Sequence, residues 1–444
     1  MQIDVSDEKY ISGKFETLKA PEIGGVAAQR LPQVVETVSE MLSQIESRGV
    51  DAVLEYSRRL DRWEGTDIEV GAQMLAASGD GLPSEVREAM AMSVDHTRRF
   101  AQEQRRQHVD FEVELIPGVI TGQKVIPVSR VGAYLPAGRF PILTSAAMTV
   151  GVAKAAGVGT VIACTPPTSA AGGHPAIMYS AYLAGVDRLF ALGGVQALAA
   201  MAFGLLGDQP IDVLVGAGNA YVAEAKRQLY GRVGIDLLAG PSEVAAIADE
   251  TAEPQLVAAD LLAQAEHGPQ SPASLVTTSR EFGLSVIEEI DRQLADLETA
   301  DVAGAAWRDY GTVYYAHDAS TAAELMDILA PEHLEIMTRD DDFFVRRLQN
   351  YGSLFLGAWS TVAYSDKGIT GTNHVLPTGR SARYTGGLSV SRYLKTVTYQ
   401  RVAESATCQV AGPVETIADF EGMVAHKSTA TRRLRAANRQ IYPR

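Results

Sequence analysis

Apolar side chains recur at helical spacing near the start of the chain. Between residues 31 and 112 they lie three and four positions apart, with charged side chains on the opposite face, until Gly49 interrupts the first run. The first apolar face is formed by Val34, Val38, Met41, Leu42 and Ile45. We therefore predict helices here, preceded by a polar N-terminal arm.

From residue 113 the pattern changes to short apolar runs that alternate with Ala-rich helical stretches. Apolar runs of strand length separated by helices are typical of βαβ units and a parallel sheet. The alternation begins again between residues 240 and 380, and the chain ends in helical, Arg-rich sequence. The predicted fold class is α/β, with two incomplete Rossmann-like parallel-sheet domains, a small N-terminal arm and a helical C-terminal tail.

These changes in pattern predict four regions. Residues 1–27 form the arm, and residues 28–112 and 241–380 together form one discontinuous α/β domain. Residues 113–240 form the other α/β domain, and residues 381–444 form the C-terminal segment.

Glycine-rich turns mark where ligands are expected, because open parallel sheets bind them at the carboxyl ends of their strands. Three turns qualify: residues 136–138, 193–194 and 216–219. Residues 216–221 read Gly-Ala-Gly-Asn-Ala-Tyr, so the third glycine of the G-x-G-x-x-G dinucleotide fingerprint is missing. A helix start of this kind can still hold a pyrophosphate. The motif therefore permits a nucleotide without demonstrating one.

Charge and composition exclude several classes of protein. The formal net charge is -15, and no basic stripe of the kind that nucleic-acid binders carry is present. The two cysteines, Cys164 and Cys408, form no CxxC pair, so a reducing compartment is expected. No apolar run is long enough for a signal peptide or a membrane span. We expect a cytoplasmic protein with no nucleic-acid or membrane partner.

A Gln-x-x-His pair is the strongest local sign of a metal site. Gln264 and His267 lie three residues apart at the end of a predicted helix, which Gly268 and Pro269 terminate. Side chains at this spacing share one helix face. Imidazole nitrogen together with an amide or carboxylate oxygen suits zinc.

Three further segments carry polar side chains that suit catalysis. Glu332 and His333 follow Pro331 at the start of an apolar run, and such a pair can serve as two separate proton handlers. A Gly-, Thr- and Asn-rich loop holds Asp366 and His374. The last segment contains Glu421 and His426, whose spacing of five is not that of a helical ligand pair.

Eight segments together resemble one family, in order and over most of the chain. They are RVGAYLPAG, GGVQALAAMAFG, GAGNAYVAEAKRQ, AGPSEVAAIAD, DLLAQAEHGP, PEHLEI, GTNHVLPT and EGMVAHK. The sequence resembles the histidinol dehydrogenases. The resemblance implies a zinc-dependent, NAD-linked oxidation of a primary alcohol through an aldehyde to a carboxylate.

The resemblance also implies roles for single residues. Zn2+ would be held by Gln264, His267, Asp366 and His426. These ligands, with His333, would line the substrate pocket together with Ser242, His374 and Glu421.

In the same way, His333 would be the base that takes the alcohol proton, and Glu332 would activate the water that hydrates the aldehyde. NAD would contact Tyr134, Gln196 and Asn219 in the domain formed by residues 113–240. The family is a homodimer with swapped C-terminal segments, so Glu421 and His426 would complete the active site of the partner chain.

The sequence departs from the family pattern in three places. The family's turn of Gly-Gly, a small residue and Ala-Pro-Leu is replaced by residues 137–141, which include Arg139. The usual Gly-Asp-Tyr around the aspartate is Ser365-Asp366-Lys367, and one extra residue lies between Asp366 and the following Gly-Thr-Asn-His. Residues 383–400 carry more basic and aromatic side chains than a histidinol enzyme is expected to have.

These departures resemble a paralogous branch, the sulfopropanediol 3-dehydrogenases, which oxidise 2,3-dihydroxypropane-1-sulfonate to sulfolactate. Arg139 would suit a sulfonate, because arginine binds oxyanions with a two-pronged fork. The alternative substrate is L-histidinol, oxidised to L-histidine. A metal hydrolase with the same side chains and a non-enzymatic NAD- or metal-sensing module remain open as other classes. NAD versus NADP preference and stereochemistry are not predicted.

Overall fold

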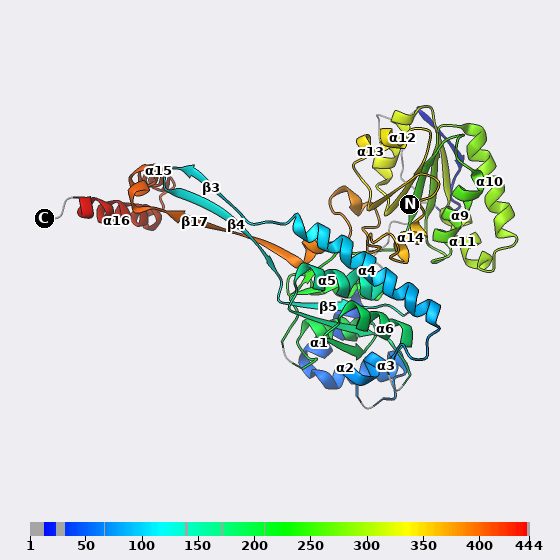
Figure 1. Ribbon diagram of the computed structural model, residues 1–444, viewed down its shortest axis with the longest axis horizontal. Coiled ribbons are helices and arrows are strands. Elements are labelled where there is room, and N and C mark those ends of the chain that lie inside the picture. Colours follow the sequence, from blue (N-terminus) through cyan, green and yellow to red (C-terminus); the bar gives the residue numbers. More distant parts are fainter. Residues whose placement is uncertain are drawn as a thin grey trace. The chain divides into compact units, whose positions relative to one another are not determined.

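The computed structural model describes residues 13–23, 32–65, 67–137, 141–169, 172–207 and 209–441 of the 444-residue chain. Its contacts divide the chain into two compact units, and Figure 1 labels several of the elements of each. The first unit joins residues 1–105 with 128–393, and the second joins residues 106–127 with 394–444.

The first unit contains two six-stranded sheets, each with a reversal of strand order. In spatial order, the first sheet consists of β11 (Gly234–Ile235), β10 (Val213–Val215), β5 (Arg130–Tyr134), β6 (Thr160–Thr165), β9 (Arg188–Ala191) and β2 (Glu69–Val70). All neighbours are parallel except β2, which is antiparallel to β9. The chain leaves β5 towards β6 and returns on the other side of β5 as β10, which makes the space between β5 and β10 the switch point.

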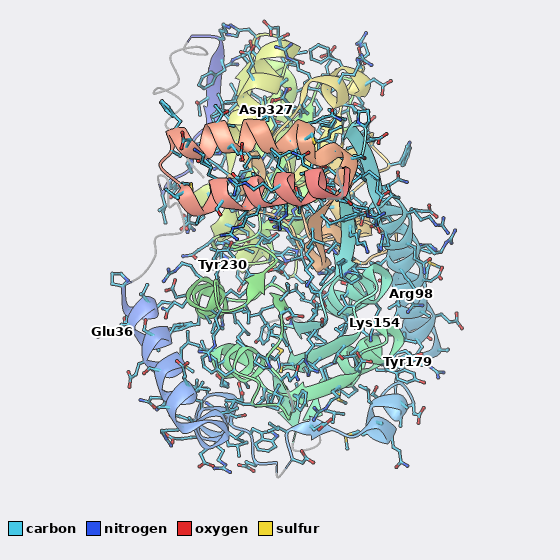
Figure 2. All side chains as sticks on the ribbon, turned by 90° about the vertical axis from the view of Figure 1, so that its left-hand side faces the viewer. Glu36, Arg98, Lys154, Tyr179, Tyr230 and Asp327 are labelled. Atoms are coloured by element: carbon cyan, nitrogen blue, oxygen red, sulfur yellow. The ribbon has the colours of Figure 1, made fainter. Side chains whose placement is uncertain are left out.

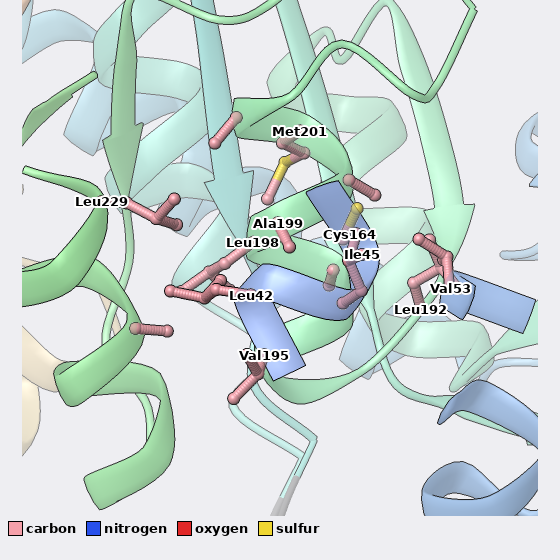
Figure 3. Close-up of a cluster of buried hydrophobic side chains, with 14 of the residues drawn as sticks. Leu42, Ile45, Val53, Cys164, Leu192, Val195, Leu198, Ala199, Met201 and Leu229 are labelled. Atoms are coloured by element: carbon pink, nitrogen blue, oxygen red, sulfur yellow. The ribbon is translucent and has the colours of Figure 1, made fainter. Parts of the chain in front are cut away.

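The N-terminal helices pack against this first sheet. The helices in its main core are α1 (Pro32–Arg48), α2 (Val50–Tyr56), α7 (Gly194–Ala202) and α8 (Ala220–Leu229). Figure 3 shows Leu42, Ile45 and Val53 among side chains of the first sheet and α7. Residues 28–112 were predicted to belong to the other α/β domain. This prediction is wrong for α1, α2 and β2, which pack or pair with the first sheet. The apolar face of a helix indicates that this face is buried, but it does not indicate which sheet it packs against.

Further helices complete this part of the first unit. They are the π-helical η2 (Ser57–Asp61) and η3 (Ala147–Gly151), and the α-helices α3 (Ala72–Ala77), α4 (Ser84–Arg106), α5 (Val152–Ala156) and α6 (Pro175–Ala184). Pro175 at the first turn and Gly185 after the last bound α6. The guanidinium of Arg98, labelled in Figure 2, ties α4 to α6 by donating to the carbonyl oxygen of Leu183 at 2.8 Å. A short hairpin consists of β7 (Pro167–Ser169) and β8 (Gly172–Gly173).

The second sheet repeats the same topology. In spatial order it consists of β1 (Phe15–Lys19), β14 (Thr312–Ala316), β13 (Ala273–Thr277), β12 (Val244–Ala248), β15 (His333–Met337) and β16 (Ser353–Leu356). Only β1 is antiparallel to its neighbour, so part of the predicted N-terminal arm is an edge strand. The chain runs from β12 outward through β13 and β14, and then returns as β15 on the other side of β12.

Helices cover both faces of the second sheet (Figure 1). One face packs against α9 (Pro254–Ala265), α10 (Arg280–Leu294) and α11 (Ala300–Tyr310). The other packs against α12 (Ala319–Leu329) and α13 (Asp341–Arg347). The buried strands are almost wholly apolar, as expected when both faces of a parallel sheet are covered. The helix α14 (Val362–Asp366) and the 3-10 helices η4 (Ser381–Arg383) and η5 (Val390–Tyr393) follow.

The second unit is a three-stranded antiparallel sheet with a helical hairpin. Its elements are β3 (Phe111–Ile116), β4 (Val119–Pro127), β17 (Leu394–Val402), η6 (Glu404–Ala406), α15 (Thr407–Phe420) and α16 (Val424–Ile441). Figure 2 shows α15 and α16 side by side. The helical tail is confirmed, but residues 113–127 lie outside the α/β domain that was predicted to begin at residue 113. Strand β17 was not predicted either.

The predicted α/β class, with two parallel-sheet regions, is confirmed. Among the residues that the structure describes, no helix has the length and apolar character needed to cross a membrane.

Candidate active site

A cluster of acid, imidazole and amide side chains gathers at the amino ends of β12 and β15. Val244 and His333, the first residues of these strands, are paired partners in the sheet. A helix that follows a parallel strand runs back across the sheet, so the end of α9 returns to this same edge. The glycine-rich turns predicted to bind ligands follow strands of the first sheet, whereas this cluster lies at the amino edge of the second sheet.

Glu332 is a buried acid held in place by two donors. Its Oε2 accepts hydrogen bonds from the Ser242 hydroxyl at 2.7 Å and from the Glu243 backbone N–H at 2.9 Å. Burial raises the pKa of Glu332 to about 8, and the negative charge of Asp366 acts in the same direction. The two hydrogen bonds oppose this shift but do not cancel it. This carboxyl group therefore changes protonation state near neutral pH, which suits proton transfer.

His333 is fixed in one tautomer. Its Nδ1 lies 2.9 Å from the backbone oxygen of Glu243. Because a carbonyl oxygen only accepts, Nδ1 carries the proton and the neutral ring leaves a lone pair on Nε2. The side chain is 2% exposed, and Nε2 is buried without a hydrogen-bond partner in the described part of the chain. Burial lowers the pKa of His333, against the opposing charge of Asp366. The ring is thus a neutral base with an open acceptor position.

His267 and Asp366 lie beside this base, and Gln264 precedes His267 by three residues at the end of α9. The Asp366 carboxylate lies between two imidazoles, with Oδ2 3.6 Å from His267 Nε2 and Oδ1 3.9 Å from His333 Nε2. Gln264 is 2% exposed, yet neither atom of its amide has a partner among the described residues. A buried amide without partners costs free energy unless a ligand satisfies it. This orphaned amide fits a metal ion held by an oxygen of Gln264.

His374 and Thr144 hold the backbone beside the aspartate. The Asp366 backbone oxygen accepts from the Thr144 hydroxyl at 2.7 Å and lies 3.1 Å from His374 Nδ1. Burial lowers the pKa of His374, and the charge of the exposed Lys367 contributes in the same direction. Lys367 also contributes to the lowered pKa of His267, where burial is again the largest cause. A fixed positive charge therefore acts on the histidines of this cluster.

Three other predicted site residues, Glu421, His426 and Arg139, do not belong to the cluster that the structure describes in the first unit. Glu421 and His426 are exposed and belong to the second unit, at the end of α15 and near the start of α16. In the described ranges, no group of three or more His, Cys, Asp or Glu side chains is placed to hold a metal ion. Of the predicted zinc ligands in the first unit, only His267 and Asp366 are of these residue types, because the third, Gln264, is an amide. Arg139 lies outside the described residues.

The predicted nucleotide contacts lie at the carboxyl edge of the first sheet. Tyr134 ends β5, and its hydroxyl accepts from the Gly194 N–H at 3.0 Å. Gln196, on α7, donates from Nε2 to Asp61 at 2.9 Å, and its Oε1 is buried without a partner in the described part of the molecule. Asp61 also accepts from the Gly193 N–H at 3.1 Å, so it occupies the start of α7. Gln196 therefore offers an acceptor oxygen in a fixed orientation.

Asn219 follows β10 across the switch point from Tyr134. Its side chain caps α8 by accepting from the N–H groups of Tyr221 and Val222 at 3.1 and 3.2 Å. The turn before it depends on Gly216, whose φ of +112° favours glycine. Lys226 and Asp236 form a buried ion pair that also binds both backbone groups of Gly216. The turn that presents Asn219 is therefore held rigidly.

Comparison with known protein families shows which family the chain belongs to. A family model described as histidinol dehydrogenase matches residues 26–434 of the chain. The chain belongs to the histidinol dehydrogenase family. The resemblance inferred from the eight motifs is confirmed, and the chain is an oxidoreductase of this family.

Individual relatives and a solved structure support membership of the histidinol dehydrogenase family. A sulfopropanediol 3-dehydrogenase from Ruegeria pomeroyi is 47% identical over 403 residues, which cover 90% of this chain and 92% of the relative. A histidinol dehydrogenase from Methanothermobacter thermautotrophicus is 37% identical over 422 residues, 95% of this chain and 98% of the relative. The crystal structure of histidinol dehydrogenase from Elizabethkingia anophelis superposes with a TM-score of 0.86 at 32% identity and covers 91% of this chain and 92% of that chain.

Two acids beside these residues of the histidinol dehydrogenase fold were not predicted: Glu243 is buried and Asp61 is half-buried. Glu243 accepts from the Gly379 N–H at 3.0 Å, and burial, with the nearby Glu332, raises its pKa to about 7. The Asp61 carboxylate accepts from the N–H of Gly193, a residue that comes 132 positions later in the sequence. For Glu243, an acid directly before a buried apolar strand was the available signal. For Asp61 the sequence carried none, because its partners are distant along the chain.

Proposed function

We propose that this protein is a zinc-dependent, NAD-linked dehydrogenase that oxidises a primary alcohol through an aldehyde to a carboxylate. The observation that carries the proposal is the His333 ring, a buried neutral imidazole whose Nε2 lone pair is open. Such a group is a general base for an alcohol O–H. The family membership supports the redox chemistry, and Tyr134, Gln196 and Asn219 are the proposed NAD contacts.

The proposed zinc ligands are Gln264, His267 and Asp366, with His426 supplied by the second unit of a partner chain. The orphaned amide of Gln264 and the Asp366 carboxylate beside His267 support this set. Bound zinc would anchor and polarise the alcohol oxygen, and bound NAD would accept the hydride. Ser242, His374 and Glu421 are proposed to line the substrate pocket.

The protein's own side chains then handle the protons. In the first oxidation, His333 Nε2 would take the proton of the alcohol O–H, and bound NAD+ would be the acceptor for the hydride of the C–H bond. Glu332 in its carboxylate form takes a proton from the water that adds to the aldehyde. The hydrated aldehyde loses the second hydride and becomes the carboxylate. In sum, one alcohol, one water and two NAD+ give one carboxylate, two NADH and three protons.

The proposed substrate is 2,3-dihydroxypropane-1-sulfonate, with sulfolactate as the product. The similarity to a sulfopropanediol 3-dehydrogenase supports this choice. So does Lys367, because a cation beside His267 and His374 attracts an anionic substrate and repels a cationic one such as histidinol. Arg139 stays a proposed second anion contact. The alternative, L-histidinol, is supported by the family membership itself.

We propose a homodimer whose second units complete each other's sites. Exposed apolar side chains on the second unit support an interface there, since large apolar patches on soluble proteins mark partner surfaces. Phe420 is 96% exposed, and Val424 and Ile417 are also exposed. Both cysteines are free, which supports the proposed cytoplasmic location.

The experiment that tests this proposal compares substrates on one purified preparation. NADH formation is followed with dihydroxypropanesulfonate, with L-histidinol and with a neutral diol of the same carbon skeleton. We expect the sulfonate to give the highest kcat/KM. A higher kcat/KM for histidinol would contradict the sulfonate assignment, and release of product from esters or amides without NADH formation would instead indicate a hydrolase.

A further inference from the structure

A second pair of acids, the buried Glu335 and the half-buried Asp260, lies on two of the elements that carry the proposed ligands and the base. Glu335, in the middle of β15, is fully buried and on the same face of the strand as His333. Asp260 lies on α9 four residues before Gln264, so these two share one helix face, and His267 follows two residues after the helix ends at Ala265. The carboxyl groups of Glu335 and Asp260 are hydrogen-bonded to each other.

Two carboxyl groups can bond to each other only if they share a proton. Glu335 Oε2 is buried without an N–H or hydroxyl donor among the described residues, and the Asp260 carboxyl group is the acidic group that acts on Glu335. Burial raises the pKa of Glu335 well above its ordinary value, and the neighbouring charge of Asp260 acts in the same direction. Glu335 is therefore the neutral acid of the pair, and its O–H donates to the Asp260 carboxylate.

The same pair also holds the start of α14. The Val362 N–H donates to Glu335 Oε1 at 3.0 Å, and the Thr361 hydroxyl donates to Asp260 Oδ1 at 2.8 Å. Helix α14 spans only Val362–Asp366, so its first residue and Asp366 are one helical turn apart. A displacement at one end of so short a helix moves the other end.

Three elements therefore meet at this acid pair: β15 with His333, α9 with Gln264 and the turn that carries His267 after it, and α14 with Asp366. We propose that Asp260 and Glu335 are positioning residues, which lock these three elements in the register that lets the proposed metal ligands converge beside the base. The metal part of this inference rests on the proposed zinc site. Neither acid touches the substrate or is itself a ligand.

Substitutions at Glu335 separate positioning from simple stability. In Glu335→Gln, the amide N–H2 donates to Asp260 and the amide oxygen accepts from Val362, so every bond of the neutral acid is reproduced. Glu335→Leu keeps the side-chain size but removes all of these bonds. Ser274→Ala is the matched control, because it removes a buried hydrogen bond on the same sheet, the 2.8 Å bond from Thr312, which joins β13 to β14 and involves no side chain of β15, α9 or α14.

The test measures the zinc dissociation constant by chelator competition, well below the melting temperature of each variant. It also measures backbone amide exchange of residues 361–366 in metal-free protein. We expect Glu335→Leu to weaken zinc binding by about 10–100-fold, the usual effect of losing a partner behind a ligand, and to speed exchange in α14. Glu335→Gln and Ser274→Ala should stay near the wild type in both measurements.

Wild-type zinc affinity and exchange in Glu335→Leu would overturn the inference, as would a Glu335→Gln variant as impaired as Glu335→Leu. If the wild-type protein binds no zinc, the zinc assignment under the proposed function fails instead. Exchange in α14 then decides separately whether the acid pair holds this helix: faster exchange in Glu335→Leu supports it, and unchanged exchange overturns it.

Discussion

At the residue scale, the neighbours of His333 and Glu332 determine what each can do. The Glu243 carbonyl fixes the His333 proton on Nδ1, and burial keeps the ring neutral. Burial also moves the pKa of Glu332 into the range where it exchanges protons. Adjacent positions at the start of one strand thus provide a neutral base and an acid of raised pKa.

Replacing His333 by Asn should cut kcat by about 10²–10⁴-fold, the range expected when a general base is lost. The KM for NAD should change little, because His333 belongs to the second sheet and the proposed NAD contacts to the first. Steady-state kinetics measure both constants. His317→Asn, at an exposed position after β14, is the control, and kcat in His333→Asn equal to that of the control would remove His333 from its role.

The oxidation of the aldehyde should depend on pH through Glu332. The carboxylate is the form that takes a proton from water, and the raised pKa keeps the group mostly protonated below about 8. The rate with aldehyde as substrate should therefore rise as pH increases through about 8 and then level off. In Glu332→Gln this rise should vanish along with most of the aldehyde oxidation, and a variant that kept the wild-type pH profile would contradict the assignment.

At the element scale, helices and strands could be predicted from the sequence where buried positions leave a regular spacing of apolar residues. The apolar face of α1 and the Gly268-Pro269 stop shortly after α9 were visible in the residues alone. The strand β3 was not, because all six of its residues are exposed and no alternation of buried and solvated positions marks it. The motifs identified Glu332, His333 and Gln264, whereas Asp61, Glu243 and the Asp260–Glu335 pair act through partners far away in the sequence.

The turn between β10 and α8 gives the prediction at this scale. In Gly216→Ala the new Cβ would collide with the backbone oxygen of Tyr134 and require a φ of +112°. We expect a loss of about 1–3 kcal/mol in unfolding free energy, the range for strain at such positions, and a raised KM for NAD as Asn219 shifts. Denaturant unfolding and NAD kinetics test this.

Gly386→Ala is the matched control, because a Cβ there meets no atom within 4 Å. The two alanine variants should differ in both stability and KM for NAD. Equal values would show that the Gly216 turn does not set the cofactor site.

At the scale of the whole molecule, the predicted site draws on both compact units. Gln264, His267, Asp366 and His333 belong to the first unit, and His426 belongs to the second. The motifs predicted this set of residues, but the sequence pattern misplaced the domain limits around it. Contacts between segments distant in the chain set those limits, as in the pairing of β17 with β4.

The most direct measurement is the zinc affinity of the chelator-treated, dialysed protein, compared between the wild type, Gln264→Ala and His426→Asn. The account predicts about one tightly bound zinc per chain in the wild type, activity that returns when zinc is added, and much weaker binding in both variants. Full activity of metal-free wild-type protein, or wild-type zinc affinity in both variants, would contradict it.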